Sequence, residues 1–181
     1  MSRFSRALGV ALLVAAAIAG CKKENQTAAP EPETFTFIRY PGAHYLAQLT
    51  ELAKQAHTIS KPGESAPPTA FYDTDAPLDT VANFYAKSYG VPKIAADITN
   101  NLSAAKPPAY YRNGDLQADV KSIEGLLQKL KVNVDISKAQ GKYRAVEFDA
   151  KPNRPRVTLQ RPYFDVTKSQ VVDRTIILMA P

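Results

Sequence analysis

The pattern of apolar and polar positions changes character along the chain. Residues 7–18 form one apolar run that contains no charged side chain. Apolar residues at helical spacing follow at residues 45–56, 75–90 and 115–131. From residue 132 onward, short apolar or alternating stretches are separated by turn residues, which is typical of strands. The pattern therefore predicts helices in the middle of the chain and strands in its second half.

The helix predicted at residues 75–90 has the clearest limits. Asp75 is a candidate N-cap, Pro77 suits a first helical turn, and Gly90 favours the left-handed conformation that ends a helix. Asp115 stands in the same relation to the helix predicted at residues 115–131. We therefore expect both aspartates to act as helix caps.

Six segments have the composition of strands. They are residues 35–40, 69–72, 132–136, 143–149, 156–163 and 171–179. Since sequential strands without intervening helices pair antiparallel, the last four are expected to form a meander. The segment before them that contains three prolines, residues 91–111, is expected to be an irregular loop. The predicted fold class is α+β, a mainly C-terminal antiparallel sheet with about three helices packed on one face.

The first 20 residues have the three parts of a secretory signal peptide. Arg3 and Arg6 precede the apolar run, and the small residues Ala19 and Gly20 follow it. A membrane-spanning helix needs about 20 apolar residues, and this run is shorter. The pattern favours a signal peptide at residues 1–20 over a membrane-spanning anchor.

Residues 18–21, Ile-Ala-Gly-Cys, resemble the lipobox of bacterial lipoproteins. The resemblance implies that the signal peptide is cut between Gly20 and Cys21, that the Cys21 thiol receives a diacylglycerol, and that its amine is acylated, commonly with palmitate. One acyl chain binds a membrane only marginally, so two or three chains are what give stable anchoring. Cys21, the only cysteine of the 181 residues, is thus expected to be a lipid anchor.

The same resemblance implies a destination. In lipoproteins of the enteric type, an aspartate after the acylated cysteine retains the protein in the inner membrane, and this chain has Lys22 at that position. The expected location is the outer membrane, with the protein facing the periplasm. The polar residues 21–34 are expected to be a disordered tether, and residues 35–181 suit a single globular domain.

Charge and composition exclude some classes of function. The net charge of +6 falls to +4 without residues 1–20, which carry two of the 23 basic residues and none of the 17 acidic ones. This mild excess, without an aromatic RNA-binding motif, gives no support to a nucleic-acid partner. His44 and His57 would lie about 220° apart on one helix, so no metal site is predicted. No cofactor is expected apart from the covalent lipid.

Two acidic motifs resemble those of haloacid-dehalogenase-type phosphatases. They are Asp73 with Asp75, and Asp115 with Asp119 after Gly114. In that family the first aspartate attacks phosphorus and the later pair helps to hold magnesium. The 38 residues between the two motifs are too few for the strands and crossovers of that fold. Helix capping explains the aspartates better, and no catalytic residue is assigned.

The C-terminal strands supply the candidate binding patch. Arg161, Tyr163 and Arg174 would gather near the turn that joins the last two predicted strands. Arginine forks and a tyrosine suit an anionic partner. The alternative interpretation is a cross-strand network in which these arginines pair with Asp165 or Asp173.

The sequence therefore predicts an envelope lipoprotein whose domain is a binding or assembly module. Its partners would be the membrane, through the anchor, and an envelope protein or an anionic cell-wall component. Residues 39–43 and 71–90 are also loosely similar to small exported bacterial proteins without an assigned activity, a resemblance that implies no function. The alternative is a small envelope hydrolase, which would require two facing carboxylates in a polar cleft.

Overall fold

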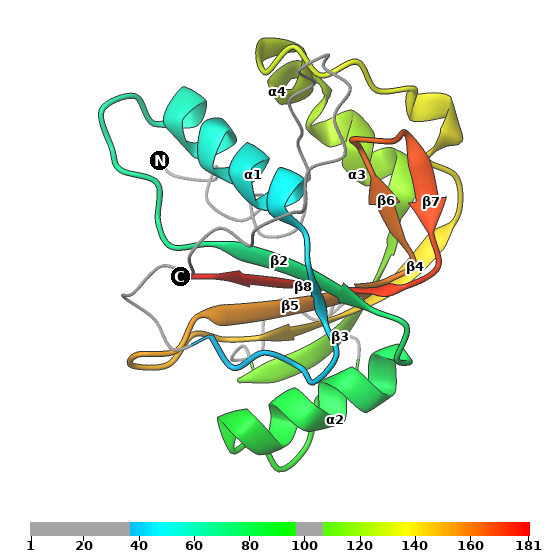
Figure 1. Cartoon of the computed structure of the whole chain (residues 1–181). Coiled ribbons are helices and arrows are strands. Elements are labelled where there is room, and N and C mark those ends of the chain that lie inside the picture. The colour runs from blue at the N-terminus through cyan, green and yellow to red at the C-terminus, as the bar shows by residue number, and fades with distance from the viewer. Residues whose placement is uncertain (1–36, 97–106) are drawn as a thin grey trace.

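An antiparallel sheet of six strands forms the centre of the protein. The computed structural model describes residues 37–96 and 107–181 (Figure 1). The strand order is β1-β2-β8-β5-β4-β3, and each neighbouring pair is antiparallel. The strands are β1 (His44–Tyr45), β2 (Ala70–Thr74), β3 (Ala109–Asp115), β4 (Lys142–Phe148), β5 (Arg156–Arg161) and β8 (Thr175–Ala180).

Helices and a small hairpin cover this sheet. The helices are α1 (Ala47–Ser60), α2 (Leu78–Tyr89), α3 (Leu116–Ser122) and α4 (Glu124–Lys129), with a short 3-10 helix, η1, at Ile136–Lys138. The hairpin pairs β6 (Tyr163–Asp165) with β7 (Gln170–Val172). The predicted α+β class, with a meander of strands in the second half of the chain, is confirmed.

The helices lie on both faces of the sheet, so the expectation of a single covered face is wrong. Helix α2 packs on one face, and α1, α3 and the β6–β7 hairpin lie on the other (Figure 1). Successive residues of β2 show the division, because Phe71 belongs to the core under α1 and Tyr72 to the core above α2. A strand buried on both sides carries apolar residues at both parities, which is why β2 and β8 show no alternating pattern.

Several predicted boundaries differ from the structure. Residues 109–115, placed at the junction of a loop and a helix, form the edge strand β3, and the helix predicted at residues 115–131 divides at Ile123. Residues 132–136 form no strand, although their alternating apolar side chains pack against the core below α1. Residues 37–40 form no strand either, while residues 35 and 36 lie outside the described residues.

The last two predicted strands are each interrupted. The first breaks at Pro162, which has no N–H to donate to a ladder, so β5 and β6 belong to different sheets. The second breaks at residues 173 and 174, between β7 and β8. Both breaks lie where the β6–β7 hairpin leaves the main sheet.

The two expected helix caps have different outcomes. Asp115 is the N-cap of α3, and its Oδ1 accepts a hydrogen bond from the Ala118 N–H at 2.9 Å. Asp75 caps nothing, because α2 begins at Leu78 with Pro77 as its N-cap residue. Gly90 ends α2 in the left-handed conformation, with φ of 62°, as predicted.

Gly114 generates a test of the packing between β3 and β4. It lies opposite Tyr143, and a Cβ at position 114 would overlap the buried Tyr143 ring. Gly114→Ala should therefore lower the free energy of unfolding by about 1–3 kcal/mol, the usual cost of overpacking. Chemical denaturation measures this change.

The matched control is Gly125→Ala in α4, where an added Cβ meets no atom within 4 Å. This change should raise stability by about 0.5–1 kcal/mol, because alanine favours a helix over glycine. Equal effects of the two substitutions would contradict the packing described for Gly114.

Candidate functional site

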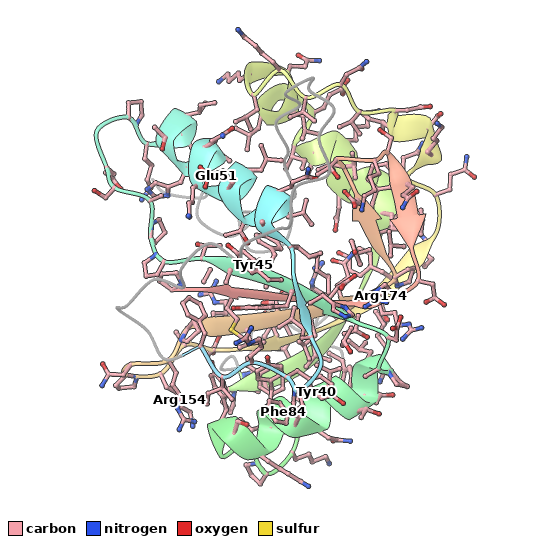
Figure 2. The ribbon with its side chains drawn as sticks, in the orientation of Figure 1. Tyr40, Tyr45, Glu51, Phe84, Arg154 and Arg174 are labelled. Carbon is pink, nitrogen blue, oxygen red and sulfur yellow. The ribbon has the colours of Figure 1, made fainter. Side chains whose placement is uncertain are left out.

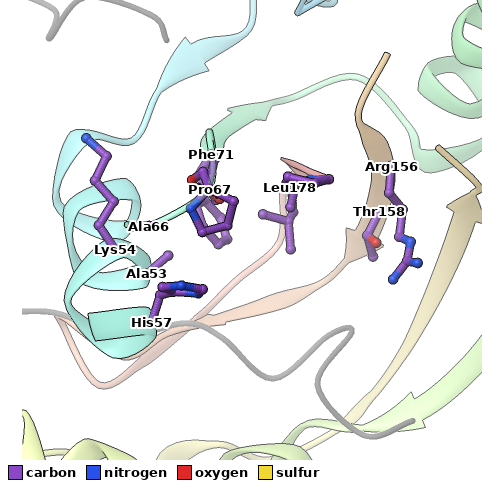
Figure 3. Close-up of a pocket in the computed structure, with 12 residues that line it drawn as sticks. Ala53, Lys54, His57, Ala66, Pro67, Phe71, Arg156, Thr158 and Leu178 are labelled. Atoms are coloured by element: carbon purple, nitrogen blue, oxygen red, sulfur yellow. Dashed lines mark hydrogen bonds between the residues drawn. The ribbon is translucent and has the colours of Figure 1, made fainter. Parts of the chain in front are cut away.

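A small pocket lies between α1 and the part of the sheet formed by β2, β8 and β5 (Figure 3). Its volume is about 160 Å³. The lining residues come from α1, the loop that follows it and the three strands: Ala53, Lys54, His57, Ala66, Pro67, Thr69, Phe71, Arg156, Thr158, Leu178, Ala180 and Pro181. None of these side chains is a carboxylate.

The sheet register explains why these residues meet. Phe71 of β2 pairs with Leu178 of β8, which in turn pairs with Thr158 of β5, so the three form one row across the sheet. Side chains two residues apart on a strand share a face, which puts Arg156 beside Thr158 on the face below α1. On α1 itself, Ala53 and His57 are four residues apart and share the face that looks onto this row.

Two polar atoms of the lining are buried without a hydrogen-bond partner among the described residues. They are Nε2 of His57 and Nε of Arg156. Figure 3 shows His57 on the helix side of the pocket and Arg156 on the strand side, with Pro67 and Leu178 between them. Buried polar groups in native proteins are nearly always paired, so nitrogen atoms without a described partner in a pocket lining make it a candidate place for a ligand or water.

Lys54 differs from these two residues. Its Nζ lies 3.5 Å from Oε2 of Glu51, one turn earlier on α1, and both side chains are well exposed. The third basic residue of the pocket is thus paired at the surface, whereas Arg156 has no ion pair with a residue of the described part of the chain.

A second cluster gathers around the carboxylate of Asp73. This residue is 6% exposed at the end of β2. Arg174 binds it in a two-pronged geometry, with Nε 2.7 Å from Oδ2 and Nη2 3.2 Å from Oδ1. The hydroxyl of Tyr163 donates a further hydrogen bond to Oδ2 at 3.1 Å. These donors satisfy the oxygen atoms of the buried carboxylate.

Arg174 links this carboxylate to two other residues. Its Nη1 donates to Oδ1 of Asp75, and its Nη2 lies 2.9 Å from Nδ1 of His44 on β1. A guanidinium group only donates, so Nδ1 of His44 is the acceptor. The hydrogen bond to Asp73 is the main reason why the pKa of Arg174 is raised. Figure 2 shows Arg174 at the end of the sheet from which the hairpin extends.

Arg161 forms a similar link at the end of β5. Its Nε donates to Oδ1 of Asp173 at 2.8 Å, and its Nη1 donates to the carbonyl groups of Asp75 at 3.0 Å and Ala76 at 3.2 Å. The hydrogen bond and the charge of Arg161 lower the pKa of the Asp173 carboxyl group. Arg161 thereby holds the turn between β2 and α2 against the start of β8.

The structure thus brings Arg161, Tyr163 and Arg174 together, as the sequence predicts. Tyr163, however, is 2% exposed and belongs to the core, so its side chain does not lie at the surface. Burial, followed by the charge of Asp73, raises the pKa of its hydroxyl group. The cross-strand pairing weighed as the alternative is present between Arg161 and Asp173, whereas Asp165 pairs with Lys168. Recognition of an anionic partner by these residues stays a prediction.

The acidic motifs are engaged within the fold. Besides its cap, Asp115 accepts a hydrogen bond from Lys142 at 3.0 Å, and Asp119 accepts one from the hydroxyl of Tyr143. Within residues 37–96 and 107–181, no group of three histidine, cysteine or acidic residues is placed to hold a metal ion. His44 and His57 lie at the Asp73 cluster and in the pocket respectively, so they do not converge.

Sequence reasoning missed the pocket. It considered His57 only as one half of a histidine pair and did not single out Arg156. The four-residue spacing of Ala53 and His57 could have indicated one face of a helix. The shared parity of Arg156 and Thr158 could have indicated one face of a strand. Their juxtaposition depends on the order β2-β8-β5, which is not visible in the sequence.

The predicted site residues of the N-terminus, Gly20 and Cys21, lie outside the described residues, together with Lys22 and the tether at residues 21–34. In the part of the chain that the structure describes, no helix has the length and apolar character needed to cross a membrane.

The Asp73 cluster generates a stability test. Asp73→Asn should lower the free energy of unfolding by about 3 kcal/mol, because it removes the buried carboxylate of the ion pair and leaves Arg174 only the exposed carboxylate of Asp75. Asp79→Asn is the control, since Asp79 pairs with Arg144 in an exposed position and such pairs contribute about 1 kcal/mol or less. Denaturant titration of both variants measures the difference. Similar losses for the two would show that the Asp73 cluster has no special structural weight.

No protein-family model, curated protein or solved structure matches this chain.

Proposed function

We propose that the protein is a bacterial envelope lipoprotein, anchored through Cys21, whose α+β domain is a binding module for an anionic envelope component. The observation that carries the binding role is the pocket beneath α1, where nitrogen atoms of His57 and Arg156 have no partner among the described residues and no side chain of the lining is a carboxylate. A site built in this way suits an acceptor-bearing, negatively charged group.

The hydrolase alternative has less support. It needs two facing carboxylates that are available for proton transfer, as in general acid–base catalysis. Asp73 and Asp75 are the first acidic pair of the motifs considered, and the guanidinium group of Arg174 binds both. Carboxylates that a structural partner already binds suit a stabilising role better than catalysis.

The anchor is proposed from the motif Ile18-Ala-Gly-Cys21 and the apolar run before it. Cys21→Ser should abolish lipid attachment and leave an unprocessed precursor, because the thiol is the acceptor of the diacylglycerol. Mass spectrometry of the protein recovered from membranes measures both changes. In the same cells, density fractionation should place the wild-type protein with outer-membrane markers.

Ala19→Ser, a small residue for a small residue at the position before Gly20, is the matched control and should be processed normally. Normal cleavage and membrane retention of Cys21→Ser would refute the anchor. Co-migration of the wild-type protein with inner-membrane markers would refute only the proposed destination.

The binding role is tested by affinity capture with the acylated protein in its native envelope. Chemical cross-linking should recover an envelope component with the wild-type protein and with Arg144→Gln, whose guanidinium group pairs with Asp79 away from the pocket. Arg156→Gln should lose that component, because it removes the unpaired charge. Equal recovery with all three proteins, or release of a hydrolysed product, would contradict the binding module.

A further inference from the structure

The pocket beneath α1 combines two kinds of lining. Phe71, Leu178 and Pro67 form an apolar part, and Arg156 with His57 supplies nitrogen donors at opposite sides (Figure 3). We infer that this pocket binds a small organic carboxylate with an apolar body, an inference that rests on the proposed binding function and names its ligand class.

Arg156 decides the charge of the ligand. Its guanidinium group is always protonated at physiological pH. Its Nε is buried and has no acceptor among the described residues, which leaves a desolvated donor of a charged group unsatisfied. A carboxylate oxygen supplies the acceptor and the opposite charge together, whereas a neutral hydroxyl supplies only the acceptor. The pocket therefore favours an anion over its neutral analogue.

His57 offers a second polar contact from the opposite side of the pocket. Its Nε2 is buried without a partner, and an imidazole nitrogen donates in one tautomer and accepts in the other. It lies across the pocket from Arg156, so it would contact the ligand at a point away from the carboxylate that Arg156 binds. Lys54 is committed to Glu51 at the surface, so two contacts and one charge fit a monoanion better than a dianion.

The size of the pocket limits the apolar body. A dry protein cavity of about 150 Å³ accommodates benzene, and this pocket measures about 160 Å³. Drug-sized ligands occupy pockets of about 300–1,000 Å³. The ligand part held here is thus a single ring or a short branched aliphatic group next to its carboxylate.

Benzoate is the probe that combines one ring with one carboxylate. The test uses the full acylated protein in detergent, labelled with nitrogen-15 at arginine, so that the Arg156 Nε–H signal reports directly on the unpaired donor. Benzoate should shift this signal in a saturable way. Benzyl alcohol, with the same ring and no charge, should bind at least about tenfold more weakly, since a hydrogen bond to a charged group is among the stronger ones.

Two variants test the proposed ligand site, one by removing the charge and the other by filling the space. Arg156→Gln should weaken benzoate binding at least about tenfold, whereas Arg144→Gln, the matched control, should change it less than twofold. Ala66→Leu keeps both nitrogen donors and fills the pocket from the loop after α1, so it should also weaken binding. If Arg156→Gln fails to fold, the wild-type signal and Ala66→Leu still decide the question.

The inference is overturned if benzoate leaves the Arg156 signal unchanged or if benzyl alcohol binds equally well. Tighter binding of phenyl phosphate than of benzoate would overturn it too, because the ligand would then be a phosphate ester. These results are separable from the proposed function. Loss of envelope capture by Arg156→Gln together with no response to benzoate would leave the binding module standing and reject only the carboxylate ligand.

Discussion

Two-sided burial of the central strands is the constraint on which the rest of the structure depends. The strands β2, β8 and β4 each contribute side chains to two separate cores, one under α1 and one above α2. With both faces of these strands apolar, the chain needs helices on both sides of the sheet, and neither layer is sufficient alone. The resulting three-layer arrangement also sets the place of the pocket, at which the side chains of α1 meet a row that runs from β2 across β8 to β5.

The same constraint explains the network around Asp73. A carboxylate at the end of β2 points into the face that α1 and the hairpin cover, so it is removed from water and requires donors. Tyr163 follows the break between β5 and β6, and Arg174 lies in the break between β7 and β8. The interruption of the predicted strands thus allows the burial of Asp73, because it brings Tyr163 and Arg174 to the same carboxylate.

Sequence patterns predicted the elements whose formation depends on nearby residues. Helix α2 with its stop at Gly90, the cap at Asp115 and the strands β4 and β5 have local causes, namely helical spacing, side-chain capping and flanking turns. The strand β3 was missed because its pairing with β4 outweighs the prolines before it.

The errors about Asp75 and residues 132–136 have the same origin. Asp75 precedes a helix as a cap does, yet Arg174, 99 residues later in the chain, binds it. Residues 132–136 alternate as a strand does, yet their apolar side chains pack on the core without a neighbouring strand. In both cases a contact between residues that are distant in sequence decides the outcome. The pocket likewise depends on contacts between residues that are distant in sequence.

The network around Asp73 and the pocket with Arg156 and His57 differ in whether their polar groups are paired. Around Asp73, each guanidinium nitrogen of Arg174 has an acceptor, and such mutual satisfaction is what a structural network requires. In the pocket, Arg156 and His57 bury nitrogen atoms that no described residue satisfies. An unsatisfied buried donor lowers the stability of the free protein, so its retention is better explained by an interaction made when a ligand is present. The network of Arg161, Tyr163 and Arg174 thus has a structural role, its recognition of an anionic partner stays a prediction, and the pocket is a further candidate for recognition.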